Sequence, residues 1–425
     1  MKVIRYSEGD KIKELLERKT LNLNEVLALV RGILENVEER GDSALINYSK
    51  KFDNFDLTKE NIRVSNEEIK KAHSRVNEKL LKALKHAHRN ITRFHEGQMR
   101  RIGEEWDIEI EKGVIVGERV TPIENIGAYI PGGRTSYPST VLMTCIPARV
   151  AGVKRVAITS PPPISDAILV AADICGVDEI YRVGGAQAIA ALTYGTESIP
   201  RVDKIVGPGN VYVMTAKMQV YGRVDIDMPA GPSEVLILAD KTANSRFIAA
   251  DLLAQAEHDP SARCLVVTDS EKIIEEAEKE IAKQINSIKT RETVKESLEN
   301  FAFILTKDTE ESIKFANQYA AEHLEIMTEN PEEVADEIKN SGAIFLGEHS
   351  PVAAGDYASG GNHVLPTGGT ARFSSVLSVR DFLKTSSIQR ITKRGLLALK
   401  ETIETISNSE GFDAHRKSVE IRFNS

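Results

Sequence analysis

Several features that mark specialised proteins are scarce or missing in this sequence of 425 residues. It has three cysteines, Cys145, Cys175 and Cys264, which are too far apart for a CxxC zinc pair or a disulfide framework. Such cysteine usage is typical of a reducing compartment, so we expect a cytoplasmic protein. The net charge is −8, and the basic excess or basic stripe of a nucleic-acid-binding protein is missing.

Long apolar runs are also lacking. The most apolar segment, residues 141–156, is interrupted by Arg149 and Lys154, so no membrane-spanning helix is predicted. The first six residues lack the apolar run of a signal peptide, in keeping with a cytoplasmic location. With 41% apolar and 28% charged residues, the composition is that of a soluble globular protein long enough for two or more domains.

The central part of the chain alternates between short apolar segments and longer segments that end at glycine. Each apolar segment predicts a strand, and each longer one predicts a helix whose final glycine is the usual helix stop. The expected strands are residues 127–130, 155–159, 179–183, 204–206, 235–238 and 264–268. The expected helices include residues 165–175, 186–194 and 211–221, each followed by glycine, and residues 245–258, which end before Pro260. This alternation predicts a parallel, doubly wound α/β architecture.

The two ends of the chain differ from this pattern. Residues up to about Asp10 resemble an arm, and the region from Leu21 to about Gly97 is expected to be helical. Ser65 and Glu68 form the spacing of a capping box at the start of one of these helices. From Val379 onward the sequence predicts helices with few strand signals. Its low apolar content indicates a tail that packs on another part of the assembly.

Two glycine-containing turns follow expected strands, at residues 183–185 and 206–210. Each joins a strand to a helix N-terminus, where backbone N–H groups and the helix dipole favour a phosphate. Neither turn has the GxGxxG spacing, and no acidic partner for an adenosine ribose is evident. The pattern is therefore compatible with nucleotide binding and equally with plain tight turns.

Pairs of polar residues near helix ends suggest chemistry without establishing it. Gln255 and His258 are three residues apart, just before Pro260, and suit either a metal ion or a solvated helix end. Glu322 and His323 stand at an expected helix-to-strand junction, where a carboxylate and an imidazole form an acid–base pair. Surface pairs of this kind are common, so the alternative of a solvated pair stays open.

Further candidates lie in a glycine-rich loop and in the tail. Asp356 and His363 belong to a polar loop, and loops of this kind often hold binding sites. Glu410 and His415 in the tail are by default capping or solvated residues. Cys145 lies in an apolar run, where a buried structural thiol competes with a nucleophile for an aldehyde.

The order of these motifs along nearly the whole chain resembles the histidinol dehydrogenase family. The motifs are GAYIPGG at 127–133, VGGAQAIAAL at 183–192, IVGPGN at 205–210, PAGPSE at 229–234, AQAEH at 254–258, AEHL at 321–324, AAGDY at 353–357, GNHVLPT at 361–367 and EGFDAH at 410–415. The resemblance implies two Rossmann-like doubly wound units with helical N- and C-terminal extensions. The implied division is an N-terminal arm at 1–20, a first α/β unit from 21–125 and 236–378, an NAD-binding unit at 126–235 and a helical tail at 379–425.

The resemblance also implies an activity. The family oxidises L-histidinol through L-histidinaldehyde to L-histidine in two NAD-dependent steps, the last of histidine biosynthesis. It uses one zinc ion per subunit, and it forms homodimers whose active sites are shared between subunits. No nucleic acid or membrane is implied as a partner.

Roles for individual residues are carried over from the matching motifs. Glu322 and His323 would be catalytic, with Glu322 activating water and His323 acting as acid and base. Zinc ligands would be Gln255, His258, Asp356 and His415, with His415 supplied by the second subunit. Substrate contacts would be Ser233, His363 and Glu410, together with His323 and the zinc ligands. The NAD site would be lined by Tyr129, Gln187 and Asn210.

Alternative functions are distinguishable. A related dehydrogenase for another small polar alcohol is the nearest, but the joint presence of His363, Glu410 and His415 favours an imidazole substrate. A zinc-dependent hydrolase would need the metal and not NAD. A binding protein without activity would have no physical need for the full set of polar site residues.

Overall fold

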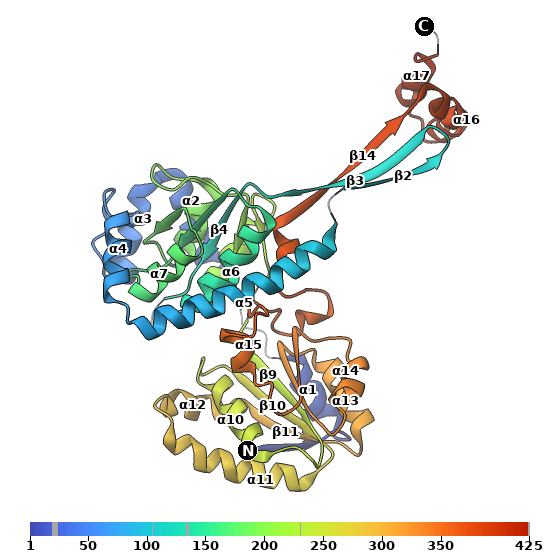
Figure 1. Ribbon diagram of the computed structural model, residues 1–425. Coiled ribbons are helices and arrows are strands. Elements are labelled where there is room, and N and C mark those ends of the chain that lie inside the picture. Colours follow the sequence, from blue (N-terminus) through green and yellow to red (C-terminus); the bar gives the residue numbers. More distant parts are fainter. Residues whose placement is uncertain (19–23, 104, 133–135, 230, 424–425) are drawn as a thin grey trace.

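The computed structural model describes residues 1–18, 24–103, 105–132, 136–229 and 231–423. Two α/β bodies lie next to each other, and a long arm extends from one of them (Figure 1). Three predicted features include residues outside the described ranges. They are the start of the helical region at Leu21, the turn at Gly133 and the motif that contains Ala230.

The first body is built on a five-stranded sheet in which all strands are parallel, in the order β6-β5-β4-β7-β8. The strands are β4 (Asn125–Tyr129), β5 (Arg155–Thr159), β6 (Glu179–Tyr181), β7 (Lys204–Val206) and β8 (Asp225–Ile226). Alternate residues of β4 face opposite sides, so Ile126 and Ala128 belong to one apolar core and Tyr129 to another. Burial on both faces explains the continuous apolar strands.

Helices cover both faces of this sheet. One layer contains α4 (Asn66–Arg75), α5 (Glu78–Ile102), α6 (Pro138–Ala151) and α7 (Asp166–Ile174). The other contains α2 (Asn24–Arg40), α3 (Asp42–Tyr48), α8 (Gly185–Tyr194) and α9 (Val211–Val220). The capping box predicted at Ser65 and Glu68 is present at the start of α4.

The second body contains a six-stranded parallel sheet in the order β1-β11-β10-β9-β12-β13. Its strands are β1 (Lys2–Arg5), β9 (Glu234–Ala239), β10 (Arg263–Thr268), β11 (Phe301–Leu305), β12 (His323–Met327) and β13 (Ala343–Leu346). One face is covered by α10 (Ser245–Ala256), α11 (Glu271–Gln284), α12 (Arg291–Ser297) and α15 (Val352–Tyr357). The other is covered by α1 (Gly9–Glu17), α13 (Thr309–Tyr319) and α14 (Pro331–Asp336).

The predicted α/β class with two doubly wound parallel units is confirmed by these two sheets. The N-terminal segment differs from the expected arm, because β1 pairs along its length with β11 at the edge of the six-stranded sheet. Across the described ranges, no helix is both long and apolar enough to cross a bilayer.

The packing of the early helices also differs from the expected division. The sequence-based division places residues 21–125 with residues 236–378, whereas helices α2 to α5 pack on the five-stranded sheet. An amphipathic helix has an apolar face but carries no signal for which of two sheets it will cover. The other unit boundaries stay predictions.

The arm is a three-stranded antiparallel sheet in the order β14-β3-β2. It consists of β2 (Glu105–Glu111), β3 (Val114–Pro122) and β14 (Leu383–Ile391), and it holds α16 (Lys393–Ser409) and α17 (Asp413–Glu420) at its far end (Figure 1). The two helices agree with the predicted helical tail, but the nine-residue strand β14 was not expected. Most of β14 is solvent-exposed, so its sequence lacks the alternation of apolar and polar residues that predicts a half-buried strand.

Candidate functional site

The carboxyl edge of the five-stranded sheet gathers the three residues expected at the NAD site. Strands β4, β5 and β6 extend the sheet to one side of β4, and β7 and β8 extend it to the other. The strand order therefore changes direction between β4 and β7, and ligands bind at such a topological switch point. Tyr129 ends β4, and its hydroxyl accepts a hydrogen bond from the backbone N–H of Gly185 at 3.1 Å. Gln187 is buried in the first turn of α8. Asn210 is exposed and caps α9, where its Oδ1 accepts from two backbone N–H groups.

The turn after β7 requires glycine, and side chains of the same body hold its backbone through hydrogen bonds. Gly207 has φ +109°, and a Cβ there would lie 2.3 Å from the carbonyl oxygen of Tyr129. The Nζ of Lys217 donates to the Gly207 carbonyl at 2.9 Å and forms a buried ion pair with Asp227. The second oxygen of Asp227 accepts from the Gly207 N–H at 2.7 Å. The backbone of this turn is therefore fixed where a cofactor phosphate or ribose would approach.

The second group of candidate residues lies at the amino edge of the six-stranded sheet. His323 is the first residue of β12 and Glu322 precedes it, as the predicted helix-to-strand junction requires. Asp356 lies in the short helix α15, and not in the polar loop expected from the sequence. His363 follows in a segment without regular structure, and its Nδ1 lies 3.1 Å from the carbonyl oxygen of Asp356.

Hydrogen bonds fix the orientation of the acid–base pair. His323 Nδ1 donates to the carbonyl oxygen of Glu234 at 3.0 Å, and Glu322 Oε2 accepts from the N–H of the same residue at 2.7 Å. The Nε2 atom of His323 lies 3.9 Å from Asp356 Oδ1. Glu322, His323 and Asp356 are all at most 9% exposed. Their side chains therefore face one another in a nearly dry environment.

Burial shifts the titration of this cluster toward uncharged forms. It lowers the pKa of His323 to about 4, and the neighbouring imidazoles of His258 and His363 add to the effect. The pKa of His363 is likewise lowered by burial to about 4. Desolvation raises the pKa of Asp356 to about 7 and that of Glu322 well above its usual range. Both imidazoles are thus neutral near pH 7, and a cation here would favour the ionised carboxylate.

The donor atoms fit a zinc ion, although one chain does not complete the set. Gln255 lies in the last turn of α10 and His258 two residues beyond its end, where the helix dipole favours a cation. Gln255 Oε1 is buried without a hydrogen-bond partner in the described part of the chain. Amide oxygen, imidazole and carboxylate are suitable ligands for zinc. Among the described residues, no three histidine, cysteine, aspartate or glutamate side chains form a metal cage by themselves.

Two predicted site residues lie elsewhere. Glu410 ends α16 and His415 belongs to α17, both exposed at the far end of the arm, away from α15 (Figure 1). Ser233 precedes β9 and is partly buried next to Glu234. One chain therefore brings together Glu322, His323, Asp356 and His363, and it leaves the tail residues outside this group.

A cavity of about 540 Å³ between the two bodies is lined by His323 of the acid–base pair. His323, Asp356 and His363 line it from the second body, and Phe94 and Gln98 line it from α5 of the first. The sequence did not predict that Phe94 and Gln98 line the cavity, because their spacing is that of an ordinary amphipathic helix. It also missed the part played by Glu234, which is 88 residues from Glu322 in the chain and appears only as a member of the motif at 229–234.

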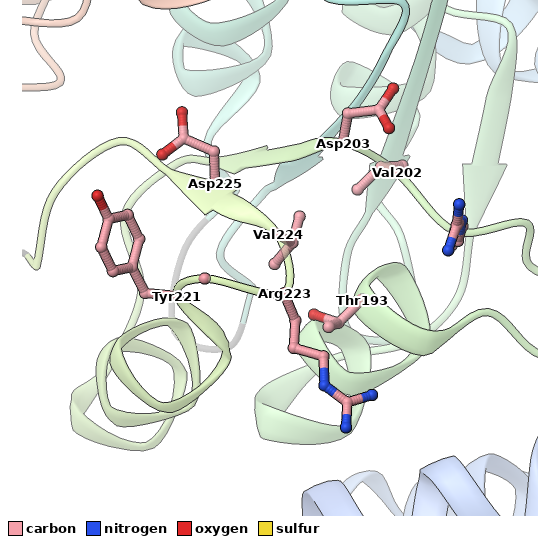
Figure 2. Close-up of a pocket in the computed structure, with 9 residues that line it drawn as sticks. Thr193, Val202, Asp203, Tyr221, Arg223, Val224 and Asp225 are labelled. Carbon is pink, nitrogen blue, oxygen red and sulfur yellow. The ribbon is translucent and has the colours of Figure 1, made fainter. Parts of the chain in front are cut away.

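A second cavity, of about 360 Å³, lies at the opposite edge of the five-stranded sheet (Figure 2). Asp203 and Asp225 stand near the starts of β7 and β8, and Arg223 reaches out below them. Asp225 is paired with Lys204, and Arg223 with Glu38. This cavity is remote from Tyr129 and Asn210 and contains none of the candidate residues.

Comparison with known proteins decides the family. A model of the histidinol dehydrogenase family matches residues 16–423. Histidinol dehydrogenase of Methanothermobacter thermautotrophicus is 51% identical over 417 residues, 97% of either chain. That of Methanocaldococcus jannaschii is 49% identical and covers 99% of this chain and 98% of its own. The crystal structure of histidinol dehydrogenase from Elizabethkingia anophelis covers 100% of this chain and 98% of its own, with 40% identity and a TM-score of 0.95.

The chain belongs to the histidinol dehydrogenase family. The predicted resemblance is thereby confirmed, together with the predicted class of activity, an NAD-dependent oxidoreductase of histidine biosynthesis. Zinc dependence follows from the family.

Within a histidinol dehydrogenase framework, Cys145 is poorly suited to attack an aldehyde. It is fully buried in α6, and burial raises the pKa of its thiol to about 12. A thiol that remains protonated and inaccessible is not a nucleophile. The structural interpretation of this cysteine is therefore favoured.

Replacing Cys145 by alanine is expected to leave turnover within about twofold of wild type, with a loss of stability on the order of 1 kcal/mol from the altered core. The measurements are NADH formation with L-histidinol and a thermal melt. A variant that is folded and binds zinc but is inactive would restore the thiol mechanism.

Proposed function

We propose that this chain converts L-histidinol through L-histidinaldehyde to L-histidine, with His323 as the acid–base residue. The observation that supports this role most directly is the hydrogen bond from His323 Nδ1 to the carbonyl oxygen of Glu234. It places the ring proton on Nδ1, so the lone pair is on Nε2, which is buried without a partner among the described residues. A neutral imidazole that lines a cavity and has one unprotonated nitrogen has the form that a general base needs.

In the first oxidation, Nε2 of His323 takes the hydroxyl proton of the alcohol. When bound, NAD would supply the hydride acceptor, so each oxidation removes two electrons from the same substrate carbon. The product is the aldehyde, and its retention in the cleft keeps it from amines in solution. Positioning of the alcohol against a fixed base lowers the barrier because no further ordering is needed in the transition state.

In the second oxidation, Glu322 takes a proton from water, whose oxygen adds to the aldehyde carbon. Protonated His323 returns its proton to the aldehyde oxygen, which gives the gem-diol and restores the neutral imidazole. Burial raises the pKa of Glu322, and a cation bound nearby would favour the ionised form that a base needs. The gem-diol then loses a proton to His323 and a second hydride, which gives the acid. Glu322 and His323 are adjacent, with 3.6 Å between Glu322 Oε2 and His323 Nδ1, so both can serve one bound substrate.

Zinc, one ion per subunit, would be held by Gln255, His258, Asp356 and the His415 of a second subunit. When bound, the ion supplies a positive charge that anchors the imidazole and amine of the substrate. The unpartnered Gln255 Oε1 supports this assignment, as does the desolvated carboxyl of Asp356. Ser233, His363 and Glu410 would complete the substrate contacts, and Tyr129, Gln187 and Asn210 would line the NAD site.

A homodimer with shared sites is proposed because the arm is incomplete in a single chain. Trp106, Ile108 and Ile110 follow one another at every second position of β2, and each is more than half exposed. Leu397 and Phe412 at the end of the arm are exposed as well. Apolar groups gathered on an extended arm are expected to be covered by a partner. A second copy would at the same time bring its Glu410 and His415 to this chain's cleft. We further propose a cytoplasmic location, with neither nucleic acid nor membrane as partner.

Purified, zinc-loaded protein is expected to form two NADH for each L-histidine produced from L-histidinol, because each oxidation releases one hydride. NADH absorbance and histidine quantification provide the ratio. A folded zinc-bearing protein that forms no NADH would contradict the proposed substrate, and a ratio of one with accumulated aldehyde would contradict the second step.

His323→Gln is expected to lower turnover roughly 100-fold or more, in line with the contribution of general acid–base catalysis. The zinc content should be unchanged, because the residue is not among the proposed ligands. Steady-state rates and metal analysis test this together. Full activity in the variant would remove the proposed role of His323.

Mixing two inactive variants, His258→Asn and His415→Asn, is expected to restore activity. A mixed dimer would contain one site with both changes and one intact site, so full subunit exchange gives about a quarter of the wild-type rate. Mass spectrometry verifies the exchange. Verified exchange without recovery would indicate that each site is formed within one chain.

A further inference from the structure

Both proposed catalytic side chains are oriented by a single residue that does no chemistry itself. Glu234, the first residue of β9, donates its backbone N–H to Glu322 and accepts from His323 through its backbone carbonyl. A shift of this one peptide segment would therefore misplace the water-activating carboxylate and the base together. What holds Glu234 in place is thus a question about catalysis.

The side chain of Glu234 is held by Arg18, which follows α1 near the N-terminus. Arg18 Nε lies 2.7 Å from Oε1 of Glu234, and a second guanidinium nitrogen lies 2.8 Å from Oε2, a paired geometry. The two side chains are 11% and 3% exposed. A carboxylate so deeply buried requires a partner, and a lost partner would favour displacement or protonation of Glu234.

Arg18 is itself fixed on other sides. It donates to the backbone carbonyl of Tyr319 at 2.8 Å, and its guanidinium lies 4.2 Å from the centroid of the Tyr319 ring. Gly369 leaves room for it, because a Cβ at that position would lie 2.2 Å from the guanidinium. Arg18 thus joins the N-terminal segment, α13, the start of β9 and the segment that follows His363.

We propose that Arg18 is a positioning residue of the reaction. It acts through the side chain of Glu234, whose backbone keeps the side chains of Glu322 and His323 correctly oriented. The proposal rests on the proposed catalytic roles of these two residues. Arg18 contacts neither of them directly, and it is assigned no contact with substrate, zinc or NAD. Its removal is therefore expected to slow the chemical steps and to leave ligand binding nearly unchanged.

The test compares Arg18→Met with Arg155→Met in the zinc-loaded full-length protein. Arg155 forms a similar partly buried ion pair with Glu179, at 2.7 Å, at the edge of the five-stranded sheet remote from the catalytic pair. Arg18→Met is expected to lower kcat roughly 10- to 100-fold, as small misplacements of catalytic groups do. KM for NAD and zinc content should stay close to wild type. Arg155→Met should lose stability without this loss of kcat, and equal kcat values in the two variants would overturn the proposal.

The two oxidation steps provide a sharper criterion. With L-histidinol and L-histidinaldehyde supplied separately, Arg18→Met should slow both steps, whereas Glu322→Gln should slow mainly the aldehyde step. The double variant Arg18→Met/Glu234→Gln should lose no more than the worse single variant, because both changes break one anchor. Losses that multiply would overturn the anchor. If Arg18→Met does not fold, Arg18→Lys replaces it, with an intermediate loss in both steps expected from its single, unpaired donor.

A readout without turnover separates this inference from the proposed function. In protein labelled with ¹⁵N-histidine, the His323 ring signals, assigned with His323→Gln, should change in Arg18→Met and not in Arg155→Met. Unchanged signals would overturn the positioning role even if the wild type oxidises L-histidinol. Inactive wild type with changed signals would instead contradict the proposed function and retain the link between Arg18 and His323.

Discussion

The hydrogen bond between His323 Nδ1 and the carbonyl oxygen of Glu234 is the contact on which the chemistry of the cleft depends. It selects the tautomer, and burial keeps the ring neutral, so Nε2 is the unprotonated nitrogen. The bond joins the first residue of β12 to the first residue of β9, and these strands are direct neighbours in the sheet. The backbone pairing of these two parallel strands therefore fixes the position of the His323 ring. Side chains on a loop would lack this constraint.

At the same edge of the sheet, several buried polar groups lack a charge or hydrogen-bond partner among the described residues of one chain. Burial raises the pKa of Glu322 and Asp356, while Gln255 Oε1 has no partner in the described ranges. Buried polar atoms are costly unless something pairs with them, so such an arrangement persists only if function requires it. A bound cation and a second subunit's arm would supply the missing charges and donors. In the proposed assembly, the exposed apolar face of β2 and the unpaired groups in the cleft are two parts of one incomplete structure.

The sequence predicts the buried parts of this fold better than the exposed ones. Strands such as β5 and β7 are buried between helices on both faces, so they appear as short apolar runs between helices that are followed by glycine. In the arm, β14 is mostly exposed and has no apolar alternation, and β1 is only four residues long, so neither produces a clear period. Strand β2 does alternate apolar and polar residues, but it was not predicted. For the site, motifs identified the polar residues themselves. Their support by Glu234 was not predictable from spacing, because 89 residues separate Glu234 from His323.

The position of the cleft follows from how the two bodies are joined. Only residues 227–233 separate the end of β8 from the start of β9, so the carboxyl edge of one sheet leads directly to the amino edge of the other. The first edge presents the N-termini of α8 and α9, whose dipoles favour anions such as the phosphates of NAD. The second presents the C-terminus of α10, whose dipole favours a cation. A short linker thus joins an edge whose helix N-termini favour anions to an edge where a helix C-terminus favours a cation. A substrate held at the cation-binding edge would have its reacting carbon directed toward a cofactor held at the other.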